Sequence, residues 1–382
     1  MTYDTGSRLA PREVDQTVTA TPAVQDLEER VNRLTRAAVM AVAASTSLAA
    51  LAACGANDEG SDGGDKGKTI ALLLPETKTT RYEAFDRPLF EAKVKDLCDD
   101  CDVKYLNADQ DASKQQEQAE SALTDGASVL VVGAVDGKAA EGIVKSAQSS
   151  DVPVVAYDRL ITNADYFVSF NNERVGELQG EALVEATGGK GDILMLNGAP
   201  TDPNAGDFKK GAHSVLDASG LNIVAEYDNP DWSPENAQEF TSTQLSKIDA
   251  ADLAGVYAAN DGQAGGVFAA LRGNGVTKMP PIVGQDAELA AIQRIVADQQ
   301  FMTVYKPIKA EAEKAAELAV NLVDGKEASD TTDFRGVPSY ILDPIKVTKE
   351  NINDTVVKDE FYSVQDICTG EYADACTAAG LS

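Results

Sequence analysis

The chain has 382 residues with 43% hydrophobic content, which is enough for two domains that each bury a core. Its formal net charge of -29 repels phosphate backbones and anionic lipid surfaces at long range, which argues against nucleic-acid binding as a function. Acidity of this degree is also typical of a solvated surface that keeps an exported protein in solution.

An export signal is predicted near the N-terminus. Three arginines, Arg30, Arg33 and Arg36, precede an uncharged, alanine-rich run over 37–53. This run is shorter than the roughly 20 apolar residues that a membrane-spanning helix needs. It ends at Cys54 and Gly55, the pattern of a lipoprotein signal peptide in which the cysteine becomes the lipidated N-terminus. The alternative interpretation is a short alanine-rich core helix.

The segments around this signal complete the N-terminal organisation. Residues 1–29 are polar and acidic, and they favour initiation at Val31 over Met1. We assign 1–53 as an N-terminal extension and signal peptide. The stretch 54–68 is rich in Gly, Asp, Asn and Ser, which predicts a flexible tether. We therefore expect an exported protein, anchored through Cys54 to the outer face of the cell membrane.

The other four cysteines form two close pairs, Cys98 with Cys101 and Cys368 with Cys376. Both pairs are predicted to form disulfides, which persist outside the cytosol. The first pair also has the spacing of a redox or metal motif. No second such motif or histidine partner accompanies it, and the aspartates between the two cysteines would raise the pKa of a thiol. No metal site is expected.

From Thr69 onward, short apolar runs alternate with amphipathic stretches. Buried strands are predicted over 69–74, 103–106, 128–132 and 152–156, with helices over 113–123 and 138–149. The series then restarts, with strands over 192–196, 222–227, 255–259 and 282–284 and helices over 205–216, 234–245, 262–271 and 288–297. Two similar α/β lobes with parallel sheets follow from this alternation.

Polar residues follow the ends of these strands. Ligands bind at the carboxyl ends of strands in open parallel sheets. The candidate ligand-binding residues are therefore Arg81, Tyr82, Asp158, Arg159, Asn204, Trp232, Asn260, Asp286 and Lys306. Charged, planar hydrogen-bonding groups combined with aromatic rings suit a neutral polyhydroxylated ligand. A phosphate site would need a Walker or dinucleotide glycine loop, and the sequence has neither.

Several candidates have a structural alternative. Trp232 lies in a polar turn, where a core position and a ligand-facing position are about equally expected. Lys306 could be a surface lysine, and Arg81 and Arg159 could pair with acids and bridge the lobes. Asp261 is predicted to cap the helix that follows it.

Catalysis has little support in the sequence. The single histidine, His213, is predicted to lie solvated on a helix face, which argues against Ser-His-Asp chemistry and a histidine metal site. The 62 acidic residues leave paired carboxylates of the glycosidase kind open. We expect a protein that is not an enzyme and has no cofactor.

The segments 156–159, 172–179, 260–266, 284–287 and 302–308 resemble the periplasmic sugar-binding proteins of type I architecture, most closely the D-xylose-binding components of bacterial ABC importers. The resemblance runs from about Thr69 to about Tyr362. It implies two Rossmann-like lobes joined by a three-segment hinge, with a pentose in the cleft between them. The boundaries it implies are 69–171 plus 307–338 for the N-terminal lobe and 172–306 plus 339–382 for the C-terminal lobe.

The resemblance also implies roles for the candidate residues. Hydroxyl groups of the sugar would be bound by Arg81, Asp158, Arg159, Asn204, Asn260, Asp286 and Lys306. Trp232 and Tyr82 would cover the two faces of the ring, and Asp202 would be a neighbour. The family carries Trp at the position of Tyr82 and Asp at that of Asn171, so these two residues bear on sugar preference.

The implied partners are a monosaccharide, the permease and ATPase of an ABC transporter, and the membrane through the lipid anchor, with the protein itself a monomer. Three alternatives stand beside D-xylose uptake. The most serious alternative keeps the role in uptake but replaces D-xylose by arabinose, ribose, glucose or galactose. A sugar-responsive transcription regulator is opposed by the signal peptide and the acidity, and an extracellular carbohydrate-active lipoprotein is the third.

Overall fold

The computed structural model describes residues 68–381. The predicted signal peptide, the lipid-anchor residue Cys54 and the tether up to residue 67 lie outside the described residues. Residues 68–381 form two α/β lobes, each built on one sheet.

The first lobe is built on a seven-stranded sheet with the strand order β11-β12-β5-β4-β3-β1-β2. Its strands are β1 (Thr69–Leu74), β2 (Asp102–Asn107), β3 (Val129–Val132), β4 (Val154–Tyr157), β5 (Tyr166–Phe170), β11 (Thr332–Phe334) and β12 (Val337–Leu342). The pairs are parallel except that of β11 with β12. The continuous apolar sequence of β1, buried in all but its first residue, is what a strand covered on both faces requires.

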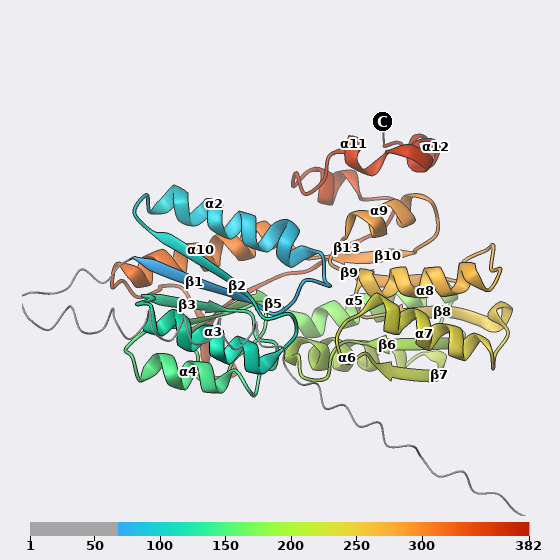
Figure 1. Cartoon of the computed structure of the whole chain (residues 1–382). Coiled ribbons are helices and arrows are strands. Elements are labelled where there is room, and N and C mark those ends of the chain that lie inside the picture. Colours follow the sequence, from blue (N-terminus) through green and yellow to red (C-terminus); the bar gives the residue numbers. More distant parts are fainter. Residues whose placement is uncertain (1–67, 382) are drawn as a thin grey trace, which may run out of the picture. The chain divides into compact units, whose positions relative to one another are not determined.

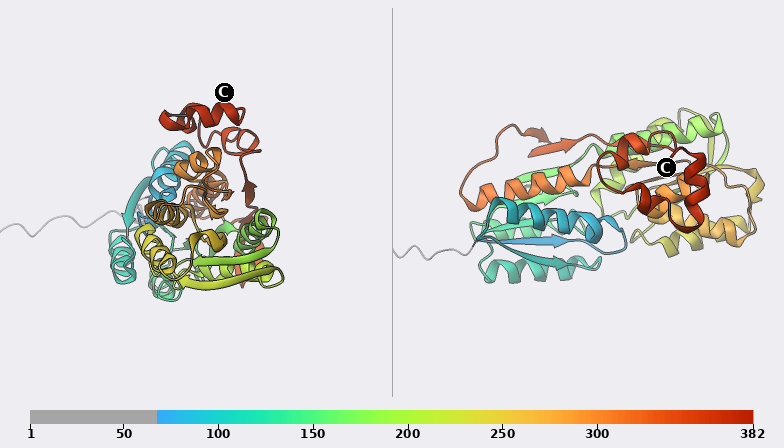
Figure 2. Two further views of the ribbon diagram at one scale, coloured as in Figure 1. Left: turned by 90° about the vertical axis from the view of Figure 1, so that its right-hand side faces the viewer. Right: turned by 90° about the horizontal axis from the view of Figure 1, so that it is seen from above.

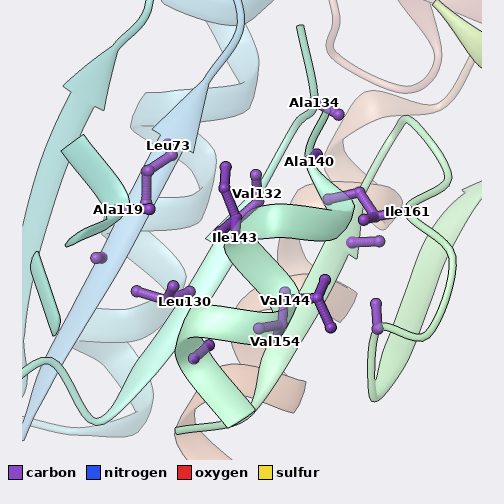
Figure 3. Packing of buried hydrophobic residues seen from close by; sticks show 14 of the residues in the cluster. Leu73, Ala119, Leu130, Val132, Ala134, Ala140, Ile143, Val144, Val154 and Ile161 are labelled. Carbon is purple, nitrogen blue, oxygen red and sulfur yellow. The ribbon is translucent and has the colours of Figure 1, made fainter. Parts of the chain in front are cut away.

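Helices cover both faces of this sheet (Figure 1). They are η1 (Tyr82–Asp86), α2 (Arg87–Leu97), α3 (Ala112–Thr124), α4 (Glu141–Gln148) and α10 (Ile308–Val323). Helices α2 and α10 share a core with one face, and α3 and α4 share a core with the other. In the core shared with α3 and α4, the sheet residues Leu73, Leu130 and Val132 lie against Ile143 and Val144 of α4 (Figure 3).

The second lobe is built on a six-stranded sheet with the order β13-β10-β9-β8-β6-β7. Its strands are β6 (Lys190–Asn197), β7 (Gly220–Asp228), β8 (Leu253–Ala258), β9 (Ile282–Gln285), β10 (Met302–Tyr305) and β13 (Ile345–Val347). Only the pair of β13 with β10 is antiparallel among the described strands of this sheet. Its helices are α5 (Asn172–Thr187), α6 (Pro203–Leu216), α7 (Pro234–Leu245), η2 (Ala250–Asp252), α8 (Asp261–Gly273) and α9 (Leu289–Val296).

The α/β fold with two parallel-sheet lobes is confirmed. In each sheet the strand order reverses between two adjacent central strands, β1 with β3 and β6 with β8. Such a reversal opens a crevice at the carboxyl ends of the strands, because the following loops run in opposite directions. Each lobe therefore offers one side of a ligand site.

The chain passes between the two lobes at three places: after β5, after β10 and after β12. The third passage corrects a predicted boundary. Strand β12 pairs in parallel with β5 from Ser339 to Leu342, so the N-terminal lobe continues to Leu342 and does not end at residue 338. The sequence around residues 338–342 is a short run of mixed polarity. Nothing in it indicates where the chain passes to the other lobe.

The segment after β13 lies beside α9 (Figure 1) and shares a core with it. It contains the short helices η3 (Asn353–Val357), α11 (Val364–Ile367), η4 (Gly370–Tyr372) and α12 (Ala373–Ala378). The structure pairs Cys368 with Cys376 in this segment, and Cys98 with Cys101 at the end of α2. None of the helices between residues 68 and 381 has the length and apolar composition of a membrane span.

Candidate functional site

A narrow cavity lies between the two lobes. Its lining consists of Thr79, Arg81, Tyr82, Asp158, Arg159, Asp202, Asn204, Phe208, Trp232, Asn260, Gln285, Asp286 and Lys306. All ten residues predicted from the sequence are among them, and all ten are buried. The sequence analysis missed Thr79, Phe208 and Gln285. The structure thus brings the candidates together in one place, and their contact with a ligand stays a prediction.

Strand ends explain how residues so distant in sequence converge. Asp158 and Arg159 follow β4, and Asp286 and Lys306 follow β9 and β10 directly. Trp232 lies in the turn between β7 and α7. Because the strands of each sheet are parallel, their carboxyl ends lie at one edge, and the two edges face the same cavity.

Three cavity residues adopt left-handed backbone conformations, which are unfavourable for most residues other than glycine. The φ angles of Asp158, Trp232 and Asp286 are 59°, 62° and 89°. Such left-handed conformations cost roughly 1–3 kcal/mol each and concentrate at functional sites. Neighbouring contacts hold each residue there, which aims its side chain into the cavity.

Arg81 is held by three carboxylates. Its Nε donates to Asp86 Oδ2 at 2.8 Å, its Nη2 donates to Asp86 Oδ1 at 2.6 Å and to Glu311, and its Nη1 donates to Asp158 Oδ1 at 3.1 Å. A guanidinium has five N–H groups, so these bonds leave one Nη1 hydrogen for a ligand. Burial raises the pKa of Glu311 well above its usual value, although the neighbouring guanidinium of Arg81 opposes this shift.

Asp158 remains ionised at the centre of the site. Burial opposes its ionisation, but Arg81 and Lys306 outweigh burial and lower the pKa of Asp158. Its Oδ2 also accepts a hydrogen bond of 2.7 Å from the hydroxyl of Tyr82. Arg81 and Arg159 lie 5.4 and 5.7 Å from the centroid of the Tyr82 ring, which fixes the orientation of that ring.

A second group of contacts forms on the opposite side of the cavity. Arg159 Nε lies 2.8 Å from Asp202 Oδ2, and the indole Nε1 of Trp232 donates to the same oxygen at 3.2 Å. Asp202 is also the N-cap of α6, because its Oδ1 accepts from the backbone N–H of Asn204 at 2.9 Å. Burial raises the pKa of Asp202 to about 6. The carboxylate therefore positions both the arginine and the tryptophan.

Lys306 is paired in the same way. Its Nζ lies 2.9 Å from Asp286 Oδ1 and within 6 Å of two aromatic rings, at 5.7 Å from Phe170 and 5.6 Å from Phe208. It is buried, so the surface position considered for this lysine is wrong. Each cation of the cavity has a carboxylate partner, which leaves the site without a strong net attraction for an anionic ligand.

Gln285 contributes a polar atom without a partner. Its buried Oε1 accepts no hydrogen bond from the residues between 68 and 381. An unsatisfied buried acceptor costs about 1–3 kcal/mol, and a hydroxyl group of a bound ligand would satisfy it. The polarity of the cavity therefore matches an uncharged molecule with several hydroxyl groups.

The capping prediction for Asp261 is wrong. The N-cap of α8 is Asn260, whose Oδ1 accepts from the backbone N–H of Gln263 at 2.9 Å. The side chain of Asp261 is instead buried under the cavity, where it accepts hydrogen bonds of 2.7 Å from both Gln300 and Thr303. Burial raises the pKa of Asp261 to about 8. Asn260 and Asp261 are adjacent, and both residue types are favoured at an N-cap, so the sequence did not show which of them caps the helix.

The comparisons with known proteins agree with this architecture. A family model described as "Periplasmic binding protein domain" matches residues 70–327. The chain belongs to the periplasmic binding protein family. The members found by comparison are solute-binding proteins and not enzymes.

Several relatives of this periplasmic binding protein bind sugars according to their names. The chain is 38% identical over 312 residues to the D-xylose-binding periplasmic protein of Escherichia coli, covering 78% of this chain and 92% of the relative. It is 32% identical to the multiple sugar-binding periplasmic receptor ChvE of Rhizobium radiobacter, covering 70% and 83%. Among solved structures, an ABC transporter solute-binding protein from Clostridium phytofermentans with bound β-D-glucose superimposes with a TM-score of 0.71 at 26% identity, covering 78% of this chain and all of that one.

Proposed function

We propose that this chain is an extracytoplasmic receptor that captures D-xylose by closure of its two lobes and delivers it to an ABC transporter. The observation that carries the proposal is that all ten predicted residues line one cavity between the lobes. The 38% identity to the D-xylose-binding periplasmic protein of Escherichia coli supports the choice of sugar.

The pairing of charges in the cavity supports a neutral sugar over a charged substrate. Arg159 is paired with Asp202 and Lys306 with Asp286, so a phosphate or carboxylate would have to displace a buried carboxylate. Hydroxyl groups can instead join each ion pair as both donor and acceptor. The rings of Tyr82 and Trp232 then offer apolar surface to the C–H faces of the sugar.

Contacts across the cleft support capture by lobe closure. Asn204 Nδ2 of the second lobe donates to the carbonyl oxygen of Asp158 at 3.0 Å. Further from the cavity, the N–H of Gly137 donates to the carbonyl oxygen of Thr201 at 3.1 Å. These contacts hold the two lobes together and would be broken in an open state, and a ligand that contacts both lobes shifts the equilibrium toward closure.

The membrane anchor is part of the proposal. Lipidation at Cys54 would hold the receptor at the outer face of the cell membrane, and the stretch 54–68 would leave the two lobes free to meet a permease. In cell fractionation, the wild-type protein is expected in the membrane fraction and a Cys54→Ala variant in the soluble fraction. A membrane-bound Cys54→Ala variant would overturn the anchor and leave sugar binding untouched.

Another monosaccharide is the alternative ligand. The similarity to the multiple sugar-binding receptor of Rhizobium radiobacter, and to a solved protein with bound β-D-glucose, supports keeping this possibility. Tyr82 bears on the choice, since the family carries a larger tryptophan ring at this position. A smaller ring leaves more room on that side of the sugar.

Isothermal titration of the purified protein tests the function directly. We expect one-to-one binding of D-xylose in the micromolar range, which corresponds to about -8 kcal/mol, and weaker binding of arabinose, ribose, glucose and galactose. Strong binding of another of these sugars with no heat from D-xylose would keep the receptor role and replace the ligand. No binding of any monosaccharide would overturn the proposed function.

A further inference from the structure

Four aromatic side chains connect the two lobes outside the cavity, and we call them the aromatic latch: Phe85, Tyr305, Phe361 and Tyr362. The ring of Phe85 stacks on that of Phe361 with centroids 4.0 Å apart and an interplanar angle of 21°. Tyr362 meets Phe85 edge-on at 5.6 Å, and Tyr305 contacts Phe361 at 5.2 Å. Phe361 therefore lies between one ring from each lobe.

Two of the rings that Phe361 contacts, those of Phe85 and Tyr305, are next to cavity residues. Phe85 lies in η1, the short helix that contains Tyr82 and follows Arg81. Tyr305 directly precedes Lys306 at the end of β10. A displacement of Phe361 is thus transmitted to two of the segments that line the cavity.

The C-terminal segment that carries Phe361 and Tyr362 is fixed to the second lobe. Strand β13 pairs with β10, and Gln293 Nε2 of α9 donates to the carbonyl oxygens of Asp366 and Ile367, both at 3.3 Å. Apolar side chains of the segment share a core with α9: Ile352, Val356, Ile367 and Leu381 pack with Ile292, Ile295 and Val296. Figure 1 shows the segment beside α9, and Figure 2 shows it from two further sides.

Phe85 is fixed to the first lobe. Helix η1 runs directly into α2, whose buried Phe90 and Val94 belong to the core that α10 shares. Phe85 of η1 and Leu89 of α2 also pack against the core of the C-terminal segment. An opening of the cleft that moves α2 away from the C-terminal segment separates Phe85 from Phe361.

We infer that the aromatic latch stabilises the closed state of the receptor, and that Phe85, Phe361 and Tyr362 are positioning residues which set the rate of sugar release. The inference rests on the proposed function, because it concerns the affinity of that same site. The C-terminal segment then acts as a third component of the binding machinery, although it contributes no residue to the cavity lining.

The test measures sugar release by stopped flow, using the fluorescence of the single tryptophan of the chain, Trp232, which lines the cavity. Phe85→Ala and Phe361→Ala are each expected to speed release about threefold to tenfold, the range expected for loss of an aromatic pair. The effects of the two substitutions should be less than additive in the double variant, because both remove the shared contact between Phe85 and Phe361. Phe361→Tyr keeps the ring and should release sugar at the wild-type rate.

Phe240→Ala is the matched control. It removes a stacked pair of similar geometry, Tyr227 with Phe240 at 4.8 Å and 11°, which lies wholly within the second lobe. It should lower the melting temperature and leave release unchanged. Wild-type release from Phe85→Ala and Phe361→Ala, or additive effects in the double variant, would overturn the latch.

A wild-type protein that binds no monosaccharide would overturn the proposed function and leave the latch to be tested without ligand. In that case small-angle scattering compares the ligand-free proteins. Phe85, which is only partly buried, can be changed to alanine without opening the core. A larger radius of gyration for Phe85→Ala than for wild type and Phe240→Ala would support the latch, and equal values would overturn it.

Discussion

Arg159 and Asp202 form a buried ion pair between the lobes, with Arg159 Nε 2.8 Å from Asp202 Oδ2. Arg159 follows a strand of the first lobe, whereas Asp202 caps a helix of the second. Burial raises the pKa of Asp202 to about 6, which shows how strongly the cavity disfavours an isolated charge at this place. The arginine offsets that cost when the lobes are closed.

Arg159→Ala is therefore expected to weaken sugar binding about a hundredfold or more, because removing one partner of a buried pair costs about 3–5 kcal/mol. Isothermal titration measures the change. Arg174→Ala is the matched control, since Arg174 lies exposed on α5 and pairs with Glu177 and Glu181. An affinity of Arg159→Ala within twofold of that of the control would contradict the role of the pair.

Gly198→Ala is expected to disturb the site through Trp232. A methyl group on Gly198 would lie 2.0 Å from Cη2 of the indole, so the ring must leave its place over the cavity. We expect roughly tenfold weaker sugar binding from the lost contact with the ring, together with a shift in tryptophan emission. Titration and fluorescence spectra check the two effects.

Gly273→Ala serves as the control for this substitution, because its added methyl group meets no atom within 4 Å. It should leave both affinity and emission unchanged. If Gly198→Ala behaved in the same way, the tryptophan would not be held by this glycine.

The position of the site could be predicted from the sequence because each strand is a continuous apolar run that ends abruptly. The run of β1 stops at Leu74 and that of β4 at Tyr157, so the polar residues that follow mark one edge of the sheet. Parallel pairing then brings these edges together without any knowledge of tertiary contacts. This argument gave nine of the ten predicted residues that line the cavity, and the tenth, Asp202, came from the resemblance to the family.

Residues that depend on tertiary contacts could not be predicted in this way. Phe208 lies one turn beyond Asn204 on α6, and an apolar residue on a helix face indicates a core position, not a cavity wall. Phe361 stacks on Phe85, a residue from the opposite lobe that is far away in the sequence. Nothing in the local pattern of either phenylalanine indicates the other.

The stability of the fold is expected to depend on pH through one residue in particular, His213. Burial alone would lower the pKa of His213, but its contacts with Asp217 at 3.0 Å and Glu226 at 3.2 Å outweigh burial and raise it above 6.5. A raised pKa in the folded state stabilises the fold fully below the unfolded value of about 6.5, and this stabilisation is lost as the pH rises through the folded value. The melting temperature of wild type should therefore fall, relative to that of His213→Gln, as the pH rises above 6.5.

Because the chain has a single histidine, its imidazole proton signal can be followed by NMR without assignment. We expect a titration midpoint above 6.5, and a lower midpoint in the Asp217→Asn variant. A wild-type midpoint at or below 6.5 would show that the two carboxylates do not stabilise the imidazolium.

The close packing of α5 on α6 gives the last prediction. A methyl group on Gly176 would lie 1.9 Å from the carbonyl oxygen of Phe208, and one on Gly211 would lie 2.0 Å from that of Glu173. These contacts involve backbone atoms on both sides, so the helices themselves must move apart. Gly176→Ala and Gly211→Ala are each expected to lower the free energy of unfolding by about 1–3 kcal/mol, and urea titration measures this loss.

Gly206 is on the same helix as Gly211, but a methyl group there meets no atom within 4 Å. Gly206→Ala should raise the free energy of unfolding by about 0.5–1 kcal/mol, since alanine loses less backbone entropy than glycine on folding. Phe208 lines the cavity, so Gly176→Ala should also weaken sugar binding, whereas Gly206→Ala should not. Equal stability of the three variants would show that α5 and α6 can separate without cost, and that their contact does not position the cavity wall.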